Sequence, residues 1–245
     1  MAPVKERPAP GRPRGARSGP SGRGAEPVGR ILWAYDRGQA LEHPLLCGVD
    51  EAGRGPLAGN VVAACVILDL DRAPLDALND SKQLLPEKRE ELYPRILECA
   101  LGYGIAESSP EEIDAINILQ ASLLAMRRAL ESLARVPSLV LVDGRQRIPG
   151  LAWPQRCLVR GDATSACIAA ASVLAKVTRD RQMRELHLLH PQYGFDRHKG
   201  YATRRHRSAL EEHGLTPFHR RSFCLDRAEQ MGLFAAAAGE SHPAE

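Results

Sequence analysis

Aromatic residues are scarce in this 245-residue sequence, where Phe, Trp and Tyr together make up only 4%. Aliphatic and alanine side chains must therefore fill most of the core, which the apolar content of 44% is large enough to form. No apolar run approaches the roughly 18 residues that a membrane-spanning helix needs. The N-terminus also lacks the apolar stretch of a secretory signal peptide. We therefore expect a cytoplasmic protein with no membrane partner.

A Cys-x-x-Cys pair is missing as well, although the sequence contains six cysteines. Four of the six lie inside apolar runs. This distribution argues against a zinc site and against the disulfide framework of a small secreted domain. We predict reduced and mostly buried thiols at positions 47, 65, 99, 157, 167 and 224.

Apolar residues are also rare at the two ends of the chain. Residues 1–30 are rich in Pro, Gly and Arg and contain seven Lys/Arg against two Asp/Glu. A segment of this composition cannot bury enough apolar surface to fold, so we predict a disordered tail there. One folded domain with a helical C-terminal part is predicted over residues 31–228, followed by a flexible tail over residues 229–245.

Charge is unevenly distributed behind the small net charge of +3. Residues 176–227 contain twelve Lys/Arg against six Asp/Glu, together with six of the eight histidines. Outside this segment and the N-terminal tail, acidic residues are in excess. An acidic centre beside a basic flank is what a metal-dependent nuclease needs, because carboxylates bind cations and a basic surface neutralises phosphates. Ordinary helix faces of mixed charge would give similar counts, so charge alone leaves both interpretations open.

Short apolar runs alternate with amphipathic segments, which predicts an α/β fold with a central, mixed or mostly parallel sheet flanked by helices. Ser109 and Glu112 form a capping box that starts one helix, whereas Pro94 is expected to kink or divide another. The helix predicted over residues 164–190 has mostly small residues in its first half, so it can lie very close to the sheet. The predicted strands cover residues 45–50, 61–68, 102–107, 139–142 and 157–159. The other predicted helices cover residues 31–42, 86–101, 110–133 and 203–213.

Carboxylates follow three of the predicted strands. Asp50 and Glu51 end the first strand, and Asp143 and Asp162 follow two later ones. Neighbouring side chains of a strand point to opposite faces, so Glu51 can join Asp50 only where the chain bends at the strand end. Sites in open α/β sheets lie at strand ends, and four carboxylates in one pocket would need cations between them. The pattern thus predicts two Mg²⁺ or Mn²⁺ ions that act on a phosphate. Solvated loop or N-cap acids are the alternative that the pattern leaves open.

The sequence blocks around these acids, in their order along the chain, resemble those of the ribonuclease HII family. The resemblance covers residues 45 to about 226. Its blocks are Gly48–Gly59, Asp80-Ser81-Lys82, Val142-Asp143-Gly144, Gly161-Asp162, Ile168–Arg181, Tyr193-Gly194-Phe195, His198–Thr203 and His219–Phe223. Asn60 and Cys167 depart from the family's usual residues, and neither is at a catalytic position.

The resemblance implies an RNase H-like fold and a two-metal endonuclease. Its substrates would be RNA–DNA hybrids and duplex DNA that contains a single ribonucleotide. Cleavage would fall on the 5′ side of the ribonucleotide and leave a 3′-hydroxyl and a 5′-phosphate, which starts the removal of ribonucleotides from DNA. Asp50, Glu51, Asp143 and Asp162 match the family's catalytic, metal-binding carboxylates, with Mn²⁺ or Mg²⁺ as the cofactor.

The resemblance also assigns substrate contacts. Gly53, Arg54 and Gly55 match the loop that recognises the ribose 2′-hydroxyl, and backbone between two glycines can contact a sugar closely. Tyr201 matches a tyrosine that packs on the following deoxyribose, and Lys82 matches a lysine that contacts phosphate.

Further basic residues are assigned less firmly by the same comparison. Lys176 is a candidate backbone contact, whereas Arg179 and Arg181 stay unassigned. His198 and Lys199 are interpreted as part of a basic rim.

Two alternatives stay open from sequence. One is a ribonuclease H that needs longer RNA–DNA hybrids and does not cut at single ribonucleotides. The other is a nucleic-acid-binding module without catalysis. The glycine-flanked arginine together with Tyr201 favours single-ribonucleotide cleavage, and the presence of all four carboxylates argues against a pure binder. We expect a monomer.

Overall fold

The computed structural model describes residues 26–224, and its five strands form one sheet in the order β3-β2-β1-β4-β5. The strands are β1 (Leu46–Ala52), β2 (Val61–Leu68), β3 (Ala100–Ser108), β4 (Leu139–Asp143) and β5 (Gln155–Leu158). β1 pairs antiparallel with β2 and parallel with β4, and β4 pairs parallel with β5. The sheet is therefore mixed, as the sequence predicts.

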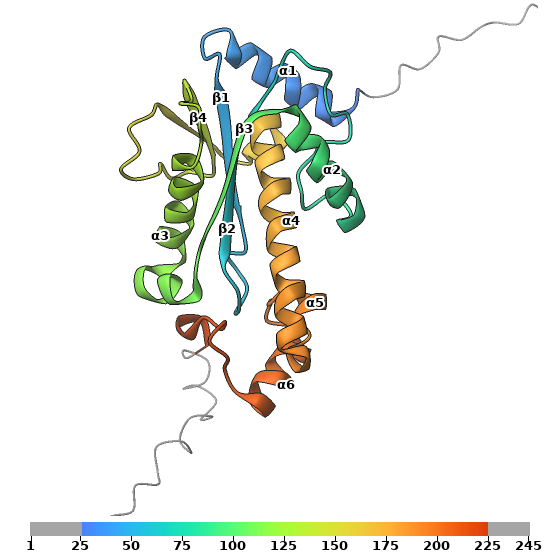
Figure 1. The fold of residues 1–245 in the computed structure, drawn as a ribbon, viewed down its shortest axis with the longest axis vertical. Coiled ribbons are helices and arrows are strands. Elements are labelled where there is room, and N and C mark those ends of the chain that lie inside the picture. Colours follow the sequence, from blue (N-terminus) through green and yellow to red (C-terminus); the bar gives the residue numbers. More distant parts are fainter. Residues whose placement is uncertain (1–25, 225–245) are drawn as a thin grey trace, which may run out of the picture.

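Helices cover both faces of this sheet. In Figure 1, α3 lies against one face, and α4, with α1 and α2 beside it, lies against the other. The helices are α1 (Val28–Ala40), α2 (Pro86–Cys99), α3 (Pro110–Glu131), α4 (Ala166–Leu189), α5 (Phe195–His198) and α6 (Arg204–His213), with short 3₁₀ helices η1 (Gly161–Ala163) and η2 (Pro191–Tyr193). α1 begins within the predicted N-terminal tail. The remainder of that tail, residues 1–25, and the tail predicted over residues 229–245 lie outside the described residues.

The core consists of two layers because the central strands are buried on both faces. Every residue of β2 is buried. Ala64 and Val66 pack in the layer under α4, whereas Cys65 and Ile67 pack in the layer under α3. This alternation explains why β2 is a continuous apolar run.

Helix α4 lies very close to β1, as its small residues predict. A β-carbon placed on Gly48 would lie 2.2 Å from both the carbonyl carbon of Cys167 and the backbone nitrogen of Ile168. Only glycine allows this approach, which fixes the position of α4 over the sheet.

Two helices differ from the sequence predictions. α2 runs from Pro86 to Cys99 as one helix, so Pro94 does not divide it. α3 starts with the predicted capping box at Ser109 and Glu112 but is interrupted at Asn117, where φ is 65° and ψ is 163°. The Asn117 side chain accepts hydrogen bonds from the backbone N–H groups of Leu119 and Gln120, so it caps the second part of α3.

Strand β5 covers Gln155–Leu158, so it starts two residues and ends one residue earlier than the predicted 157–159. All six cysteines are free and four of them are buried, which confirms the prediction of reduced, mostly buried thiols. None of the helices between residues 26 and 224 combines the length and apolarity that a membrane span requires.

Candidate active site

The parallel pairing of β1 with β4 places two carboxylates side by side. Val49 is opposite Val142, so Asp50 and Asp143 follow as neighbours at the carboxyl end of the two strands. Asp50 is 4% exposed. Burial raises the pKa of Asp50 well above its usual value, and the negative charges of Glu51 and Asp143 raise it further. The site therefore disfavours the ionised form of Asp50 unless a cation compensates its charge.

The Glu51 side chain lies on the opposite face of β1 from Asp50, but the negative charge of Asp143 acts on both carboxylates. The Glu51 side chain is 12% exposed, and Arg54 Nη1 is 3.3 Å from its Oε1. Burial raises the pKa of Glu51; the positive charge of Arg54 opposes this shift and the charge of Asp143 adds to it. Glu51 thus belongs to the same electrostatic cluster, although β1 continues in register through Glu51 to Ala52 and the bend predicted at Glu51 is not found there.

Asp162 reaches the cluster through a sharp turn after β5. Arg160 adopts the left-handed conformation with φ 58°, and Asp162 follows in η1. The Gly161 N–H donates a hydrogen bond of 2.7 Å to Oδ1 of Asp143, so this turn is tied directly to the end of β4. Asp162 is 4% exposed, and burial raises its pKa against the opposing charge of Lys82.

The four carboxylates offer hard oxygen donors, the kind that Mg²⁺ and Mn²⁺ prefer. Burial and nearby negative charge disfavour the charged forms of Asp50, Glu51 and Asp162, and bound cations would relieve this. The donor set therefore fits the predicted ions. Within residues 26–224, however, no group of three or more His, Cys, Asp or Glu side chains is close enough together to hold a metal ion. The metal site itself stays a prediction.

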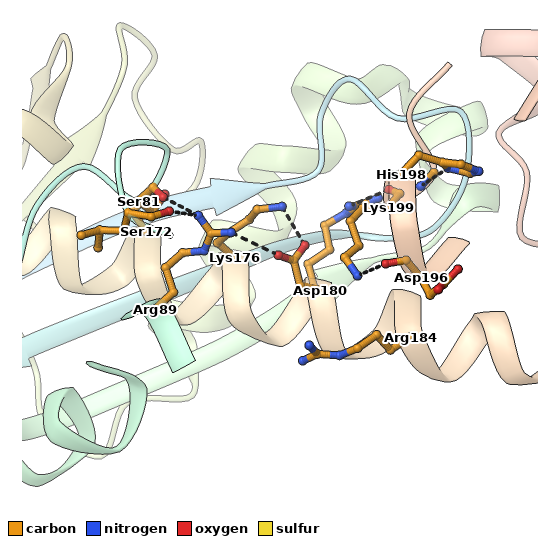
Figure 2. A network of polar contacts seen from close by, with 12 residues as sticks. Ser81, Arg89, Ser172, Lys176, Asp180, Arg184, Asp196, His198 and Lys199 are labelled. Carbon is orange, nitrogen blue, oxygen red and sulfur yellow. Dashed lines mark hydrogen bonds and ion pairs between the residues drawn. The ribbon is translucent and has the colours of Figure 1, made fainter. Parts of the chain in front are cut away.

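Lys82 is placed over the carboxylates by the loop before α2. Its Nζ is 3.3 Å from Oδ2 of Asp162. The preceding residue, Ser81, is buried and shares a hydrogen bond of 2.8 Å with the hydroxyl of Ser172 on α4. Arg89 Nη1 donates to the carbonyl oxygens of Ser81 and Leu84, both at 2.7 Å. These contacts fix the loop that presents Lys82 (Figure 2).

The same network contains Lys176, which the sequence suggests as a contact to nucleic acid. Lys176 Nζ donates to Oδ1 of Asp180 at 2.7 Å, and Arg89 Nη2 is 3.7 Å from Oδ2 of the same carboxylate (Figure 2). Lys176 therefore balances a buried acid. Arg181 is exposed and pairs with Glu90 of α2.

The loop Gly53–Asn60, which follows β1, is held by two buried arginines that sequence reasoning did not assign. Arg220 donates hydrogen bonds to the carbonyl oxygens of Gly53, Arg54, Pro56 and Gly59. Arg179 donates to those of Ala58, Asn60 and Lys199. The two arginines are 1% and 0% exposed in the order Arg179, Arg220. Because so many carbonyl groups point inward to these guanidiniums, the loop has one defined conformation.

The sequence does contain a signal for one of these arginines. Arg179 lies four residues after Ala175 and four before Met183, on the buried stripe of α4. A charged residue at such a position must find buried partners, so this spacing predicts a structural arginine. Arg220 has no such signal, since it lies in an irregular segment far along the chain.

Tyr201 lies beside the glycine-flanked arginine, as its predicted role requires. A β-carbon placed on Gly55 would be 3.5 Å from Cε1 of the Tyr201 ring. The ring is 47% exposed, so it can meet a ligand. His198, predicted on a basic rim, is instead half-buried, and burial lowers its pKa. It packs under the segment that carries Tyr201.

Comparison with known proteins agrees with this geometry. A family model described as ribonuclease HII matches residues 47–226. A ribonuclease HII from Idiomarina loihiensis is 58% identical over 179 residues, which cover 73% of this chain and 95% of that protein. A ribonuclease HII from Ralstonia nicotianae is 56% identical over 202 residues, 81% of this chain and 84% of that protein.

Solved structures show the same fold. The crystal structure of the ribonuclease H2 from Pyrococcus horikoshii superimposes with a TM-score of 0.65 at 28% identity, over 78% of this chain and 99% of that one. Bst-RNase HIII in complex with Mn²⁺ superimposes with a TM-score of 0.59 at 16% identity, over 78% of this chain and 70% of that one. RNase HII from Archaeoglobus fulgidus, solved as a PCNA:RNase HII complex, has a TM-score of 0.56 at 23% identity and covers 82% of this chain and 98% of its own.

Proposed function

This chain belongs to the ribonuclease HII family and is an RNase H endonuclease that acts on RNA in hybrids, and from that premise we propose that it also cuts at a single ribonucleotide embedded in duplex DNA. The cut falls on the 5′ side of the ribonucleotide and leaves a 3′-hydroxyl and a 5′-phosphate. The enzyme thereby starts the removal of ribonucleotides from DNA.

The proposal is supported most by the electrostatic coupling of four acids: in addition to burial, the charges of Glu51 and Asp143 raise the pKa of Asp50, and the charge of Asp143 also raises the pKa of Glu51 and of Asp162. Asp50 and Asp143 follow a matched pair of residues on parallel strands, and Asp162 is brought in by the hydrogen bond from Gly161 to Asp143. A nucleic-acid-binding module would gain nothing from acids that repel phosphates. The arrangement supports hydrolysis with bound cations.

These four carboxylates are the residues that would hold two Mg²⁺ or Mn²⁺ ions. When bound, such ions supply activation of the attacking water and stabilisation of the leaving oxygen. Lys82 and Arg54 lie at the rim of the cluster, each paired with one of its carboxylates. Their ammonium and guanidinium groups then face the substrate's phosphates, which they hold in line for attack.

Substrate selection is the task of the loop Gly53–Asn60 and of Tyr201. The rigid backbone around Gly53, Arg54 and Gly55 contacts the ribose 2′-hydroxyl. The Tyr201 ring, exposed beside Gly55, packs on the deoxyribose that follows. The loop thus selects a ribose and Tyr201 selects a deoxyribose after it. A single ribonucleotide in DNA satisfies both contacts and is therefore a substrate.

The deciding experiment uses an end-labelled DNA duplex with one internal ribonucleotide, incubated with Mg²⁺, with Mn²⁺ or with a chelator. We expect one metal-dependent cut on the 5′ side of the ribonucleotide. No cut there, with cleavage of a long RNA–DNA hybrid, would instead establish a hybrid-directed enzyme. Binding of both substrates without cleavage would establish a module that only binds.

A further inference from the structure

We propose that three packed histidines, His198, His206 and His219, form a positioning element that fixes Tyr201 against the loop Gly53–Asn60 and thereby sets the preference for DNA after the ribonucleotide. The inference rests on the proposed role of Tyr201. Within residues 26–224, no hydrogen bond or ion pair joins these three histidines to the carboxylate cluster. Their function is therefore separate from hydrolysis itself.

The hydrogen-bond partners determine which ring nitrogens carry protons. His206 Nδ1 is 3.0 Å from the carbonyl oxygen of Tyr201, and because a carbonyl only accepts, this nitrogen must carry a proton. His219 Nδ1 accepts from the Thr216 N–H at 2.9 Å, so its proton is on Nε2. That Nε2 is 3.0 Å from Nε2 of His206, which accepts the bond. Both histidines of the pair are therefore neutral. The hydrogen bonds form a chain in which Thr216 donates to His219, His219 to His206 and His206 to the Tyr201 carbonyl.

His198 holds the other side of the same turn. Its Nε2 lies 2.7 Å from the carbonyl oxygen of Tyr193, so it donates there, and its Nδ1 accepts from the Gly200 N–H at 3.2 Å. The ring stacks on His206 with 4.6 Å between centroids and 16° between planes. Imidazole nitrogens thus bind the Tyr201 carbonyl and the N–H of the preceding residue, Gly200.

The turn needs this support because its backbone is in an unfavourable conformation. Lys199 has φ 52° and Gly200 has φ 82°, and a left-handed conformation at a lysine persists only where the surroundings fix it. Arg179 binds the Lys199 carbonyl, and the Gly200 carbonyl accepts from the Leu57 N–H at 2.9 Å. The turn and the loop Gly53–Asn60 are consequently one connected unit.

Two aromatic residues, Tyr193 and Phe195, pack against the histidines. Tyr193 stacks on Phe195 with 5.3 Å between centroids, and Phe195 meets His206 edge-on at 5.4 Å. His206 and His219 are 0% and 2% exposed. An apolar side chain could fill this space, but it could not both accept from His219 and donate to Tyr201. The arrangement explains why imidazole is used here.

The test measures kcat/KM on two substrates with the full chain. One is a duplex in which DNA follows a single ribonucleotide, and the other is a uniform RNA–DNA hybrid. We expect Tyr201→Ala to lower the ratio of the first to the second by about tenfold or more, as loss of a specific contact does. His206→Leu should lower it by at least about threefold, and His206→Asn, whose amide can still donate to Tyr201, should restore most of it.

The outcomes separate the two ideas. An unchanged ratio in His206→Leu, while Tyr201→Ala changes it, overturns the inference and leaves the proposed function intact. An unchanged ratio in Tyr201→Ala removes the role of Tyr201 and with it the inference. Should His206→Leu fail to fold, ¹⁵N NMR of the unaltered protein decides the matter. The inference requires a proton on Nδ1 of His206 and on Nε2 of His219, and the opposite assignment overturns it.

Discussion

Gly53 and Arg179 are in such close contact that a β-carbon on Gly53 would lie 2.0 Å from Nε of the guanidinium. Gly53 also has φ 99°, a conformation that other residues rarely adopt. The loop Gly53–Asn60 therefore starts with glycine for two independent reasons, one conformational and one steric. The contact also explains how a residue of α4 controls a loop more than a hundred positions earlier in the chain.

Gly53→Ala should lower cleavage of the single-ribonucleotide duplex by about tenfold or more, because the loop and Arg179 cannot both keep their positions. The free energy of unfolding should fall by about 2–4 kcal/mol, which urea denaturation measures. Gly214→Ala is the matched control. Its φ of 72° carries a similar conformational cost, but nothing lies within 4 Å of the added carbon and the residue is outside the loop. Equal activity losses in both variants would contradict the steric argument.

Arg220→Lys should lose most of the bonds that hold the loop. One ammonium cannot reproduce a planar fork that reaches the carbonyls of Gly53, Arg54, Pro56 and Gly59. We expect a loss of about 2–4 kcal/mol in unfolding free energy and a large drop in cleavage. Arg221→Lys, at an exposed neighbouring position, should change neither by a measurable amount. Wild-type stability in Arg220→Lys would show that the loop is fixed by other contacts.

Asp50→Asn should abolish cleavage and leave duplex binding largely intact, since binding depends on basic side chains and not on the carboxylate cluster. Without bound metal, the same variant should be more stable than the wild type at neutral pH by about 1 kcal/mol, because it removes a buried charge that Glu51 and Asp143 repel. Activity assays, gel-shift binding and thermal unfolding test the three parts. Retained cleavage would remove Asp50 from the mechanism.

Acid should weaken the fold through the histidine pair. Burial lowers the pKa of His206 and His219 to about 4 from an ordinary value of 6.5. Between these values the unfolded chain binds more protons than the folded one, so the free energy of unfolding falls as pH drops from about 6.5 to about 4. The stabilisation is fully present above pH 6.5.

A comparison isolates this effect from other groups. Burial raises the pKa of Asp36 to about 6, which makes the folded state lose stability as pH rises through the same window. The wild type should therefore be compared with His219→Gln, in which Asp36 is unchanged. Urea unfolding from pH 7 to 4 should show a steeper loss for the wild type. Parallel curves would show that the histidines are protonated in the folded state.

How far the sequence predicts this molecule depends on the range of the interactions. Strands β1, β2 and β4 and the positions of Asp50, Asp143 and Asp162 follow from local apolar runs that end in acids. The break at Asn117 does not, since a good helical pattern continues through it and the side chain's own capping bonds decide the outcome. The carbonyl bonds of Arg220 join residues more than 160 positions apart. No local pattern encodes such pairs.

Helix α4 runs past both the carboxylate cluster and the loop Gly53–Asn60. Ser172 hydrogen-bonds to Asp50 of the cluster, and Arg179 binds the Ala58 carbonyl of the loop. Seven residues separate them, about 10 Å along the axis at the usual helical rise. The close packing of the α4 backbone against Gly48 prevents the helix from shifting along its axis. The helix therefore fixes the distance between the carboxylate cluster, the proposed site of cleavage, and the loop Gly53–Asn60, the proposed site of ribose recognition. One residue inserted between Ser172 and Arg179 would rotate the arginine by about 100° around the helix axis. Arg179 would then no longer support the loop Gly53–Asn60, although the carboxylate cluster and every side chain would still be present.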